Sequence, residues 1–97
     1  MIPYEFHYEA EEELAESAVF YNSRVIDLGE SFTSEVQRVV NMVRDHPDLG
    51  SPLGAMLRRI LVRRFPYSVI YRHDRGRIFI IAVAHQHRRP GYWRHRE

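Results

Sequence analysis

The segment from Ile78 to His85 restricts the fold more than any other feature of this sequence. It reads Ile-Phe-Ile-Ile-Ala-Val-Ala-His and follows the turn residues Asp74-Arg75-Gly76-Arg77. A short apolar run after a turn signal is typical of a strand that is buried on both sides. Side chains alternate between the two faces of a strand, so both faces here need apolar cover. Simple alternation assigns Phe79, Ile81 and Val83 to one face and Ile78, Ile80, Ala82 and Ala84 to the other.

Three more segments have the composition of strands. Residues 2–8 place aromatic side chains at period two, and residues 57–65 and 67–73 are rich in apolar and β-branched residues. Pro66 separates the last two segments and fits a turn better than a strand ladder. Gly76 supplies the positive-φ position of a hairpin between residues 67–73 and 78–85. The sequence therefore predicts four strands, three of which are consecutive.

Between the first strand and the other three, the apolar residues take the spacing of helices. Residues 9–25 carry an apolar stripe at spacings of three and four, and residues 30–45 carry a second stripe. Pro47 ends the second helix. The acids Glu9 and Glu11 to Glu13 are interpreted as a solvated helix face that complements the helix dipole. The two stripes predict an αα-hairpin.

The predicted order is β-α-α-β-β-β, in a single domain that covers residues 1–97. The predicted fold class is α+β, with the helical hairpin packed on one face of a small, mainly antiparallel sheet. Two helices can cover only one face of such a sheet. The strand at residues 78–85 then exposes apolar area on the opposite face, and we expect a partner protein to cover it.

The composition excludes several classes of protein. There is no cysteine, so disulfides and thiolate metal sites are excluded. No apolar run approaches the ~20 residues of a membrane span, and the first residues show no signal-peptide pattern. We therefore expect a cytoplasmic protein that does not bind membranes. We expect no cofactor and no metal, because His85 and His87 alone are too few ligands for zinc.

The net charge of +1 hides a strong asymmetry between the two halves of the chain. Residues 1–50 contain eleven acids and three arginines, a balance of −8, whereas residues 51–97 contain two acids and eleven arginines, a balance of +9. All fourteen Lys or Arg residues are arginine. Arginine binds phosphate and carboxylate through a planar fork. Genome base composition can explain arginine in place of lysine, but it does not explain why the charge is confined to one half.

Short signatures are spread along nearly the whole chain. The more specific ones lie in its second half and are Arg63-Arg64-Phe65-Pro66-Tyr67 with Ser68-Val69-Ile70-Tyr71, and Ala82-Val83-Ala84-His85 with Arg88-Arg89-Pro90-Gly91-Tyr92-Trp93. Weaker ones are Ala10-Glu11-Glu12-Glu13-Leu14 with Ala18 and Tyr21, Leu28-Gly29 with Phe32 and Glu35, and Pro47 with Gly50. With the length and the order of elements, these signatures resemble the RelE/ParE superfamily of toxins from bacterial type II toxin–antitoxin systems.

The resemblance implies a toxin that inhibits growth, as in plasmid stabilization systems, and that a cognate antitoxin neutralises. The disordered tail of such an antitoxin is often acidic, which suits an arginine-rich surface. RelE-like members cut messenger RNA on the ribosome, whereas ParE-like members act on DNA gyrase without nuclease chemistry. RelE-like nucleases carry a basic residue where this chain has Ser68. This departure favours the ParE-like target, but the sequence leaves both targets open.

The C-terminal cluster contains the types of side chain that metal-free RNA cleavage requires. Histidine can act as acid or base near neutrality, arginine can stabilise a charged phosphorane, and an aromatic ring can stack on a base. The candidate catalytic residues are His85, His87, Arg89 and Tyr92. The candidate residues for binding RNA or another target are Arg59, Arg63, Arg64, Arg88 and Trp93.

The same residues also have structural alternatives. His85 can be a histidine at the end of a strand, and Tyr92 and Trp93 can cap the core with the C-terminal segment. A third functional hypothesis is a nontoxic nucleic-acid or protein binding module on the same fold. A growth assay with the chain expressed alone separates this module from the two kinds of toxin.

Overall fold

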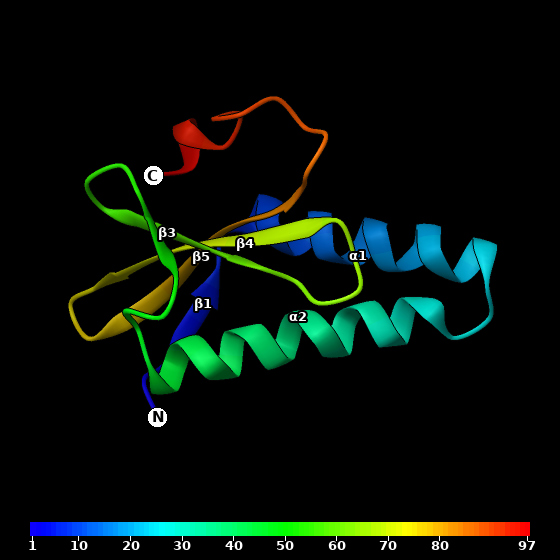
Figure 1. The fold of residues 1–97 in the computed structure, drawn as a ribbon, viewed down its shortest axis with the longest axis horizontal. Helices are drawn as coiled ribbons and strands as arrows, with labels where there is room; N and C mark the ends of the chain where they lie inside the picture. Colours follow the sequence, from blue (N-terminus) through cyan, green and yellow to red (C-terminus); the bar gives the residue numbers. More distant parts are fainter.

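Strand β5 (Arg77–His85) lies inside a five-stranded sheet, and two helices cross one face of that sheet (Figure 1). The structure is a computed structural model that describes residues 1–97. Along the chain the elements are β1 (Tyr4–Phe6), α1 (Tyr8–Arg24), α2 (Leu28–Asp45), β2 (Ser51–Leu53), β3 (Leu57–Leu61), β4 (Tyr67–Asp74), β5 and the short 3-10 helix η1 (Arg94–Arg96). The predicted α+β class and the predicted order of elements are confirmed.

The strands lie in the order β1-β5-β4-β3-β2. Strand β1 runs parallel to β5, and the other neighbours are antiparallel. The edge strand β2 was not predicted, because Pro52 lies at its centre. Proline is compatible with a strand only at a sheet edge or bulge, and β2 lies at the edge of this sheet. The strand predicted over residues 57–65 ends at Leu61 instead, because the chain turns back toward β4. Arg64 takes a left-handed φ of 71° in that turn.

Helix α2 supplies most of the helix side of the core. Its fully buried side chains form the predicted stripe and are Phe32, Val36, Val39, Val40 and Val43. They pack against a set of sheet residues that includes Val69, Tyr71, Ile78, Ile80 and Val83. Burying one large apolar side chain contributes about 1.5–3 kcal/mol, so this stripe contributes strongly to the stability of the core. Helix α1 fully buries only Ala10.

The two helices are in close contact at Gly29. A Cβ atom at this position would lie 2.3 Å from the carbonyl oxygen of Ala18, so no larger residue fits. The Gly29 N–H donates a hydrogen bond of 2.7 Å to Asn22 Oδ1. Asp27, in the short link between the helices, takes a left-handed φ of 64°. The hairpin therefore ends in a tight turn, which projects beyond the sheet (Figure 1).

A β-bulge in β5 changes which face its side chains occupy. Ile70 pairs with Ala82 and Tyr71 pairs with Ile80, so Ile81 has no partner on β4. Such an extra residue reverses the alternation that follows it. As a result Val83 lies on the helix side with Ile80, while Ile81 and Ala82 both face the other side. Simple alternation is therefore wrong for the second half of this strand.

The other face of the sheet is covered by the chain itself. The C-terminal segment, residues 86–97, returns across the sheet (Figure 1), and Trp93 is only 5% exposed. Trp93 belongs to a second apolar cluster with Leu57, Ile70, Ile81, Ala82 and Ala84. The predicted exposed apolar face is therefore wrong, because the C-terminal segment supplies the missing cover. The structural alternative for Trp93, that it caps the core with this segment, is confirmed. An uncovered sheet face therefore gives no reason to expect a partner there.

A buried ion pair fastens the C-terminal segment to α1. Arg96 donates two parallel hydrogen bonds to Glu13, from Nη1 to Oε1 at 2.9 Å and from Nη2 to Oε2 at 3.0 Å. The side chains of Arg96 and Glu13 are 5% and 14% exposed. Burial acts to lower the pKa of Arg96, but the hydrogen bond and charge of Glu13 outweigh it and raise that pKa. Arg96 thus stays charged.

Glu13 and Arg96 also form hydrogen bonds with backbone groups at the bulged edge of β5. The last pairing of β1 with β5 joins Phe6 to Ile80. Beyond it, the Val83 N–H donates to Glu13 Oε1 at 3.0 Å, and Arg96 Nη1 donates to the Ile81 carbonyl at 3.2 Å. Two side chains therefore satisfy backbone groups that β1 does not reach, and unsatisfied buried groups of this kind are costly.

The interpretation of the acidic cluster as a solvated face is wrong for two of its members. Glu13 is buried in the ion pair, and Glu9 lies 2.9 Å from His95 Nε2 and 3.7 Å from Arg96 Nη2. The hydrogen bond to His95 lowers the pKa of Glu9. Spacing along a helix reports which residues share a face, but it does not show that a distant segment will return to that face.

Replacing Arg96 with alanine is expected to lower the free energy of unfolding by about 3–5 kcal/mol, because it leaves the buried Glu13 carboxylate without its partner. Urea denaturation of the parent and the variant measures this change. Arg94→Ala is the matched control in the same short helix, because its side chain is 69% exposed, and it should cost less than about 1 kcal/mol. Equal, small losses for the two variants would contradict the assignment.

Candidate functional site

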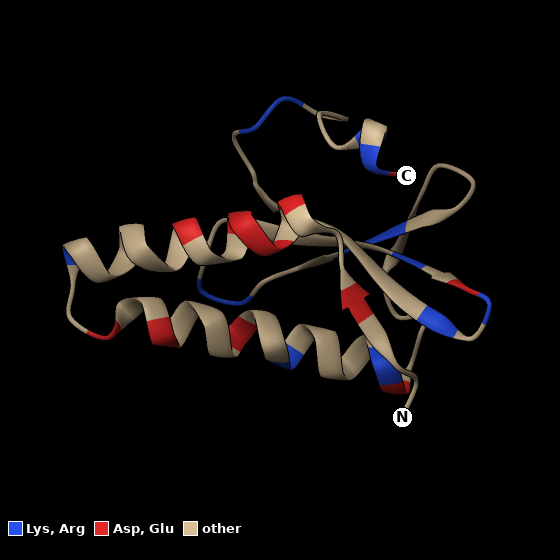
Figure 2. Cartoon of the chain, turned by 180° about the vertical axis from the view of Figure 1, so that it is seen from behind, with Lys and Arg blue, Asp and Glu red and all other residues tan.

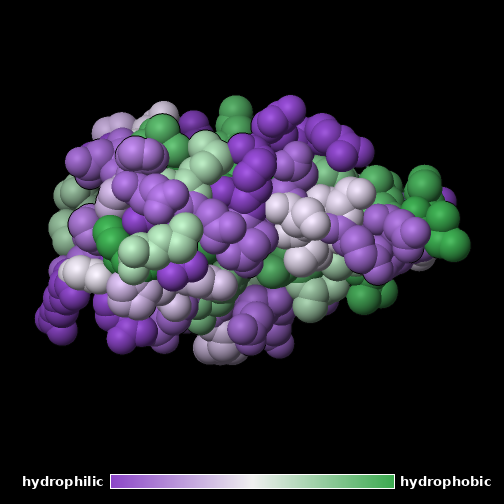
Figure 3. All heavy atoms as spheres, turned by 90° about the horizontal axis from the view of Figure 1, so that it is seen from below, coloured by the Kyte–Doolittle hydropathy of each residue, from purple (hydrophilic) through white to green (hydrophobic).

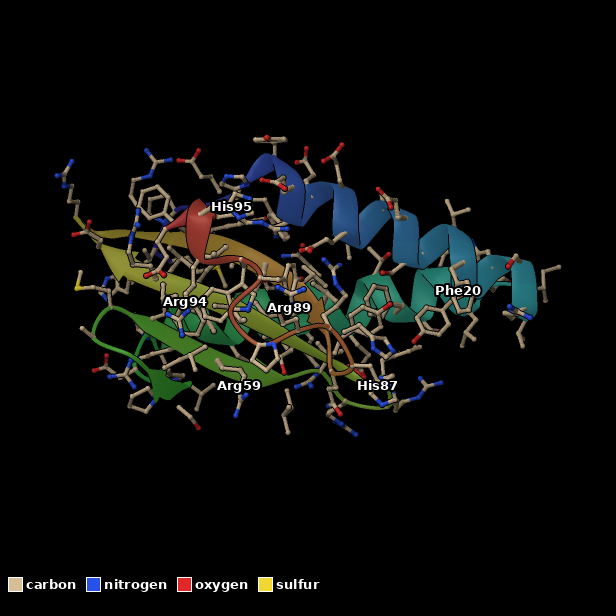
Figure 4. The ribbon with its side chains drawn as sticks, turned by 90° about the horizontal axis from the view of Figure 1, so that it is seen from above. Phe20, Arg59, His87, Arg89, Arg94 and His95 are labelled. Atoms are coloured by element: carbon tan, nitrogen blue, oxygen red, sulfur yellow. The ribbon has the colours of Figure 1, made fainter.

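A groove with a cavity volume of about 450 Å³ lies between the C-terminal segment and strands β3 to β5. Its floor contains the buried apolar residues Ile70, Ala84 and Trp93, and the exposed Leu61 also lines it. Its rim carries four arginines, namely Arg59 from β3 and Arg88, Arg89 and Arg94 from the C-terminal segment. Figure 4 shows Arg59, Arg89 and Arg94 around this part of the molecule. We call it the arginine-rimmed groove.

The structure brings most of the sequence-predicted site residues together. Six of them line the arginine-rimmed groove, namely Arg59, His85, Arg88, Arg89, Tyr92 and Trp93. His87, Arg63 and Arg64 do not. Arg64 lies instead beside α2, with Glu35 and Arg38. The Arg38 guanidinium, 2.8 Å from the Glu35 carboxylate, lowers the pKa of that acid, and the charges of Arg63 and Arg64 act in the same direction.

The two candidate histidines are connected to each other and to the end of the sheet. The ring of His85 lies edge-on to Tyr67, with 5.0 Å between centroids, and 5.1 Å from the ring of His87. His85 Nδ1 accepts a hydrogen bond of 3.0 Å from the His87 N–H. A neutral His85 therefore carries its proton on Nε2. This bond gives His85 a structural role in starting the turn after β5.

The side chain of Tyr92 makes two contacts, one through its hydroxyl and one through its ring. Its hydroxyl donates a 2.6 Å hydrogen bond to Glu13 Oε2, and the guanidinium carbon of Arg88 lies 3.9 Å from its ring centroid. Burial, and then the bond to Glu13, raise the pKa of the Tyr92 hydroxyl well above its usual value. A hydroxyl that holds its proton this firmly is a poor base or acid near neutral pH. Tyr92 therefore positions Arg88 and joins the ion pair.

Two further positions limit what the groove can do chemically. Trp93 is packed into the second apolar cluster, so its ring is not free to stack on an unpaired base. Ser68 is buried and lines the groove, so the position that is basic in RelE-like nucleases supplies only a hydroxyl here. The groove offers fixed positive charge over an apolar floor. That combination suits binding better than proton transfer.

Sequence reasoning missed Glu13, Arg94 and Arg96. Glu13 lies in an acidic run typical of a helix start, and Arg94 and Arg96 follow a turn in which Gly91 takes a φ of 79°. A glycine after Pro90 signals that turn, but it does not say where the returning segment will lie. No group of three or more His, Cys, Asp or Glu residues could hold a metal ion. None of the helices has the length and apolar character needed to cross a membrane.

Comparison with known proteins identifies the family. The family model of the ParE toxin of the type II toxin–antitoxin system parDE matches residues 4–90. The chain belongs to the ParE toxin family. That match ends before Tyr92, Trp93 and Arg96, so the residues that fasten the C-terminal segment lie beyond the part shared with the ParE toxin model.

A solved structure has the same fold as this ParE toxin family member. It comes from the chromosomal ParDE TA system of P. aeruginosa and superposes with a TM-score of 0.65. The alignment covers 88% of this chain and 96% of that chain, at 20% sequence identity. At this identity the likeness shows the fold alone. No curated protein sequence matches the chain significantly.

In the Tyr92→Phe variant, the free energy of unfolding is expected to fall less steeply as the pH rises through the alkaline range. The folded state raises the pKa of Tyr92, so the unfolded chain releases this proton near its ordinary pKa of about 10 while the folded chain keeps it. The resulting stability is fully present below about pH 10 and is lost as the pH rises toward the folded-state pKa. Urea denaturation across the alkaline range measures the two slopes.

The variant should retain part of the alkaline slope, because burial also raises the pKa of Tyr21 and Tyr71. Tyr8→Phe is the control, since Tyr8 is 68% exposed and should leave the slope unchanged. Identical slopes for the parent and Tyr92→Phe would show that the Tyr92 hydroxyl is not held as described.

Proposed function

We propose that this protein is the toxin of a type II toxin–antitoxin pair and inhibits growth in the cytoplasm by binding DNA gyrase through the arginine-rimmed groove, without cutting RNA. The observation that carries this proposal is the hydrogen bond between Tyr92 and Glu13. It ties a candidate catalytic side chain into the interior, and the neighbouring candidate His85 uses Nδ1 for a backbone hydrogen bond.

The positions of the candidate acids and bases do not favour RNA cleavage. General acid–base catalysis requires side chains within reach of the substrate that exchange protons near the working pH. Tyr92 keeps its proton, His87 lies outside the groove, and His85 uses Nδ1 to accept a backbone hydrogen bond. One remaining imidazole nitrogen does not make the acid–base pair that RNA cleavage needs.

The arginines around the groove favour a binding role. Arg59 reaches the groove from β3, and Arg89 and Arg94 reach it from the C-terminal segment. Arginine stays charged at any ordinary pH and pairs with carboxylates or phosphates through two parallel hydrogen bonds. Gyrase bound to DNA presents both groups, and the apolar floor adds area that excludes water. Family membership supports gyrase over the ribosome as the target.

The proposed antitoxin would place an acidic, partly apolar segment against the same half of the molecule. The charge balance of +9 over residues 51–97 favours such a partner, and opposite charges speed association. The antitoxin would thus contact the arginine-rimmed groove, and not the sheet face that was predicted to be exposed. A toxin whose groove is occupied in this way could not reach its target.

Arg59→Ala combined with Arg89→Ala is expected to weaken inhibition of DNA supercoiling by about a hundredfold or more, since each of the two lost charge-assisted contacts costs roughly 1.5–3 kcal/mol. The assay uses purified gyrase and the purified chain. Arg75→Ala is the matched control, because Arg75 is 88% exposed in the β4–β5 turn and lies outside the groove. It should inhibit as the parent does.

The nuclease alternative predicts a different result for histidine. In a nuclease, His85→Ala or His87→Ala should reduce cleavage about a hundredfold or more, whereas in a binding toxin both folded variants should still inhibit supercoiling. Ribosome-dependent cleavage of messenger RNA by the parent, with supercoiling unaffected, would overturn the proposal. A parent chain that inhibits neither process and leaves growth unchanged would favour the nontoxic binding module.

A further inference from the structure

Four large apolar side chains are exposed where helix α1 turns into α2. They are Val19, Phe20, Val25 and Ile26, and they are 71%, 49%, 56% and 87% exposed. We call this group the hairpin tip. Figure 3 shows hydrophobic residues gathered at the corresponding end of the molecule. Contiguous exposed apolar groups on a small protein commonly mark a contact surface.

The fold does not require apolar residues at the hairpin tip. None of the four belongs to either apolar cluster or to the residues packed against them. The turn itself is held by polar and backbone contacts, through the Gly29 N–H bond to Asn22 and the left-handed Asp27. Polar residues at Val19 and Ile26 would be compatible with the same turn. Their apolar character therefore points to a partner.

The surroundings of the hairpin tip are mostly acidic. Glu16, Asp27 and Glu30 lie on the helices and the link around it. The basic residues near them are Arg24 and Arg64, which shares a surface hollow with Asp27 and Glu30. The guanidinium carbon of Arg24 lies 4.9 Å from the ring centroid of Phe20. Figure 2 shows acidic residues along both helices and basic residues mainly on the sheet and the C-terminal segment. A partner for the tip should be apolar at its centre and basic at its rim.

The arginine-rimmed groove of the same protein has this character. Its floor contains Ile70 and Trp93, and its rim contains Arg59 and Arg89 among other arginines. A volume of about 450 Å³ accommodates one or two branched side chains. In Figure 4 the labelled Arg59, Arg89 and Arg94 lie well apart from Phe20, so a tip cannot fill the groove of its own chain.

We infer that the hairpin tip of one copy docks into the arginine-rimmed groove of a second copy of this chain. Ile26 and Phe20 would enter the apolar floor, and Asp27 and Glu30 would meet the arginine rim. Because the two surfaces differ, each contact leaves one tip and one groove free, so the assembly either extends or closes into a ring. Self-association of this kind would also cover the groove, and it does not depend on which target the toxin has.

Sedimentation velocity of the full-length chain over a wide range of concentration tests the inference. The average mass should rise with concentration, and added salt should oppose the rise, because exposed charges are screened. Phe20→Ser with Ile26→Ser removes the tip anchors and should raise the dissociation constant about a hundredfold or more, because each of the two side chains loses about 1.5–3 kcal/mol of apolar burial. Met56→Ser is the matched control, because Met56 is 60% exposed in the β2–β3 turn and should associate normally.

Mixing two defective variants gives the decisive result. The Phe20→Ser/Ile26→Ser chain retains its groove, and an Arg59→Glu/Arg89→Glu chain retains its tip. Each should be monomeric alone, and the mixture should form a one-to-one heterodimer and nothing larger. Circular dichroism melts confirm that both variants are folded. A parent that is monomeric at every concentration, a groove variant that associates alone, or a mixture that stays monomeric would each overturn the inference.

Discussion

The ion pair between Glu13 and Arg96 is the contact on which the second half of this structure depends. It joins the first helix to the last residues of the chain, and it also satisfies the Val83 N–H and the Ile81 carbonyl at the bulge in β5. Removing it would free the C-terminal segment and leave polar groups unpaired beside the core. A buried pair is often no more stabilising than a hydrophobic replacement, so its importance here lies in fixing one position for the segment.

The arginine-rimmed groove follows from that position. Held by Arg96 and by Trp93, the C-terminal segment lies across the sheet and brings Arg88, Arg89 and Arg94 opposite Arg59. Tyr92 links the two parts, since its hydroxyl reaches Glu13 and its ring carries Arg88. Residues that looked suited to catalysis therefore build the walls of the groove that we propose as a binding surface.

The sequence was sufficient to predict those elements whose structure is determined by residues close together in the chain. The helical hairpin, the final strands and their order follow from apolar spacing and turn residues, and the grouping of His85, Arg89 and Tyr92 follows from their nearness in sequence. The bulge at Ile81 could not be predicted, because it depends on pairing with β4 and on side chains from both ends of the chain. Glu13 and Arg96 are 83 residues apart, and nothing in their own neighbourhoods indicates that they meet.

The most direct test of this account follows Trp93 and the Val83 amide together. Trp93 is the only tryptophan, so its fluorescence reports on the C-terminal segment alone, and hydrogen exchange at Val83 reports on the bond to Glu13. In folded Arg96→Ala, the account predicts red-shifted Trp93 emission and faster exchange at Val83, with exchange in the α2 core unchanged. A variant in which Trp93 stays buried and Val83 stays protected would contradict the central role of the ion pair.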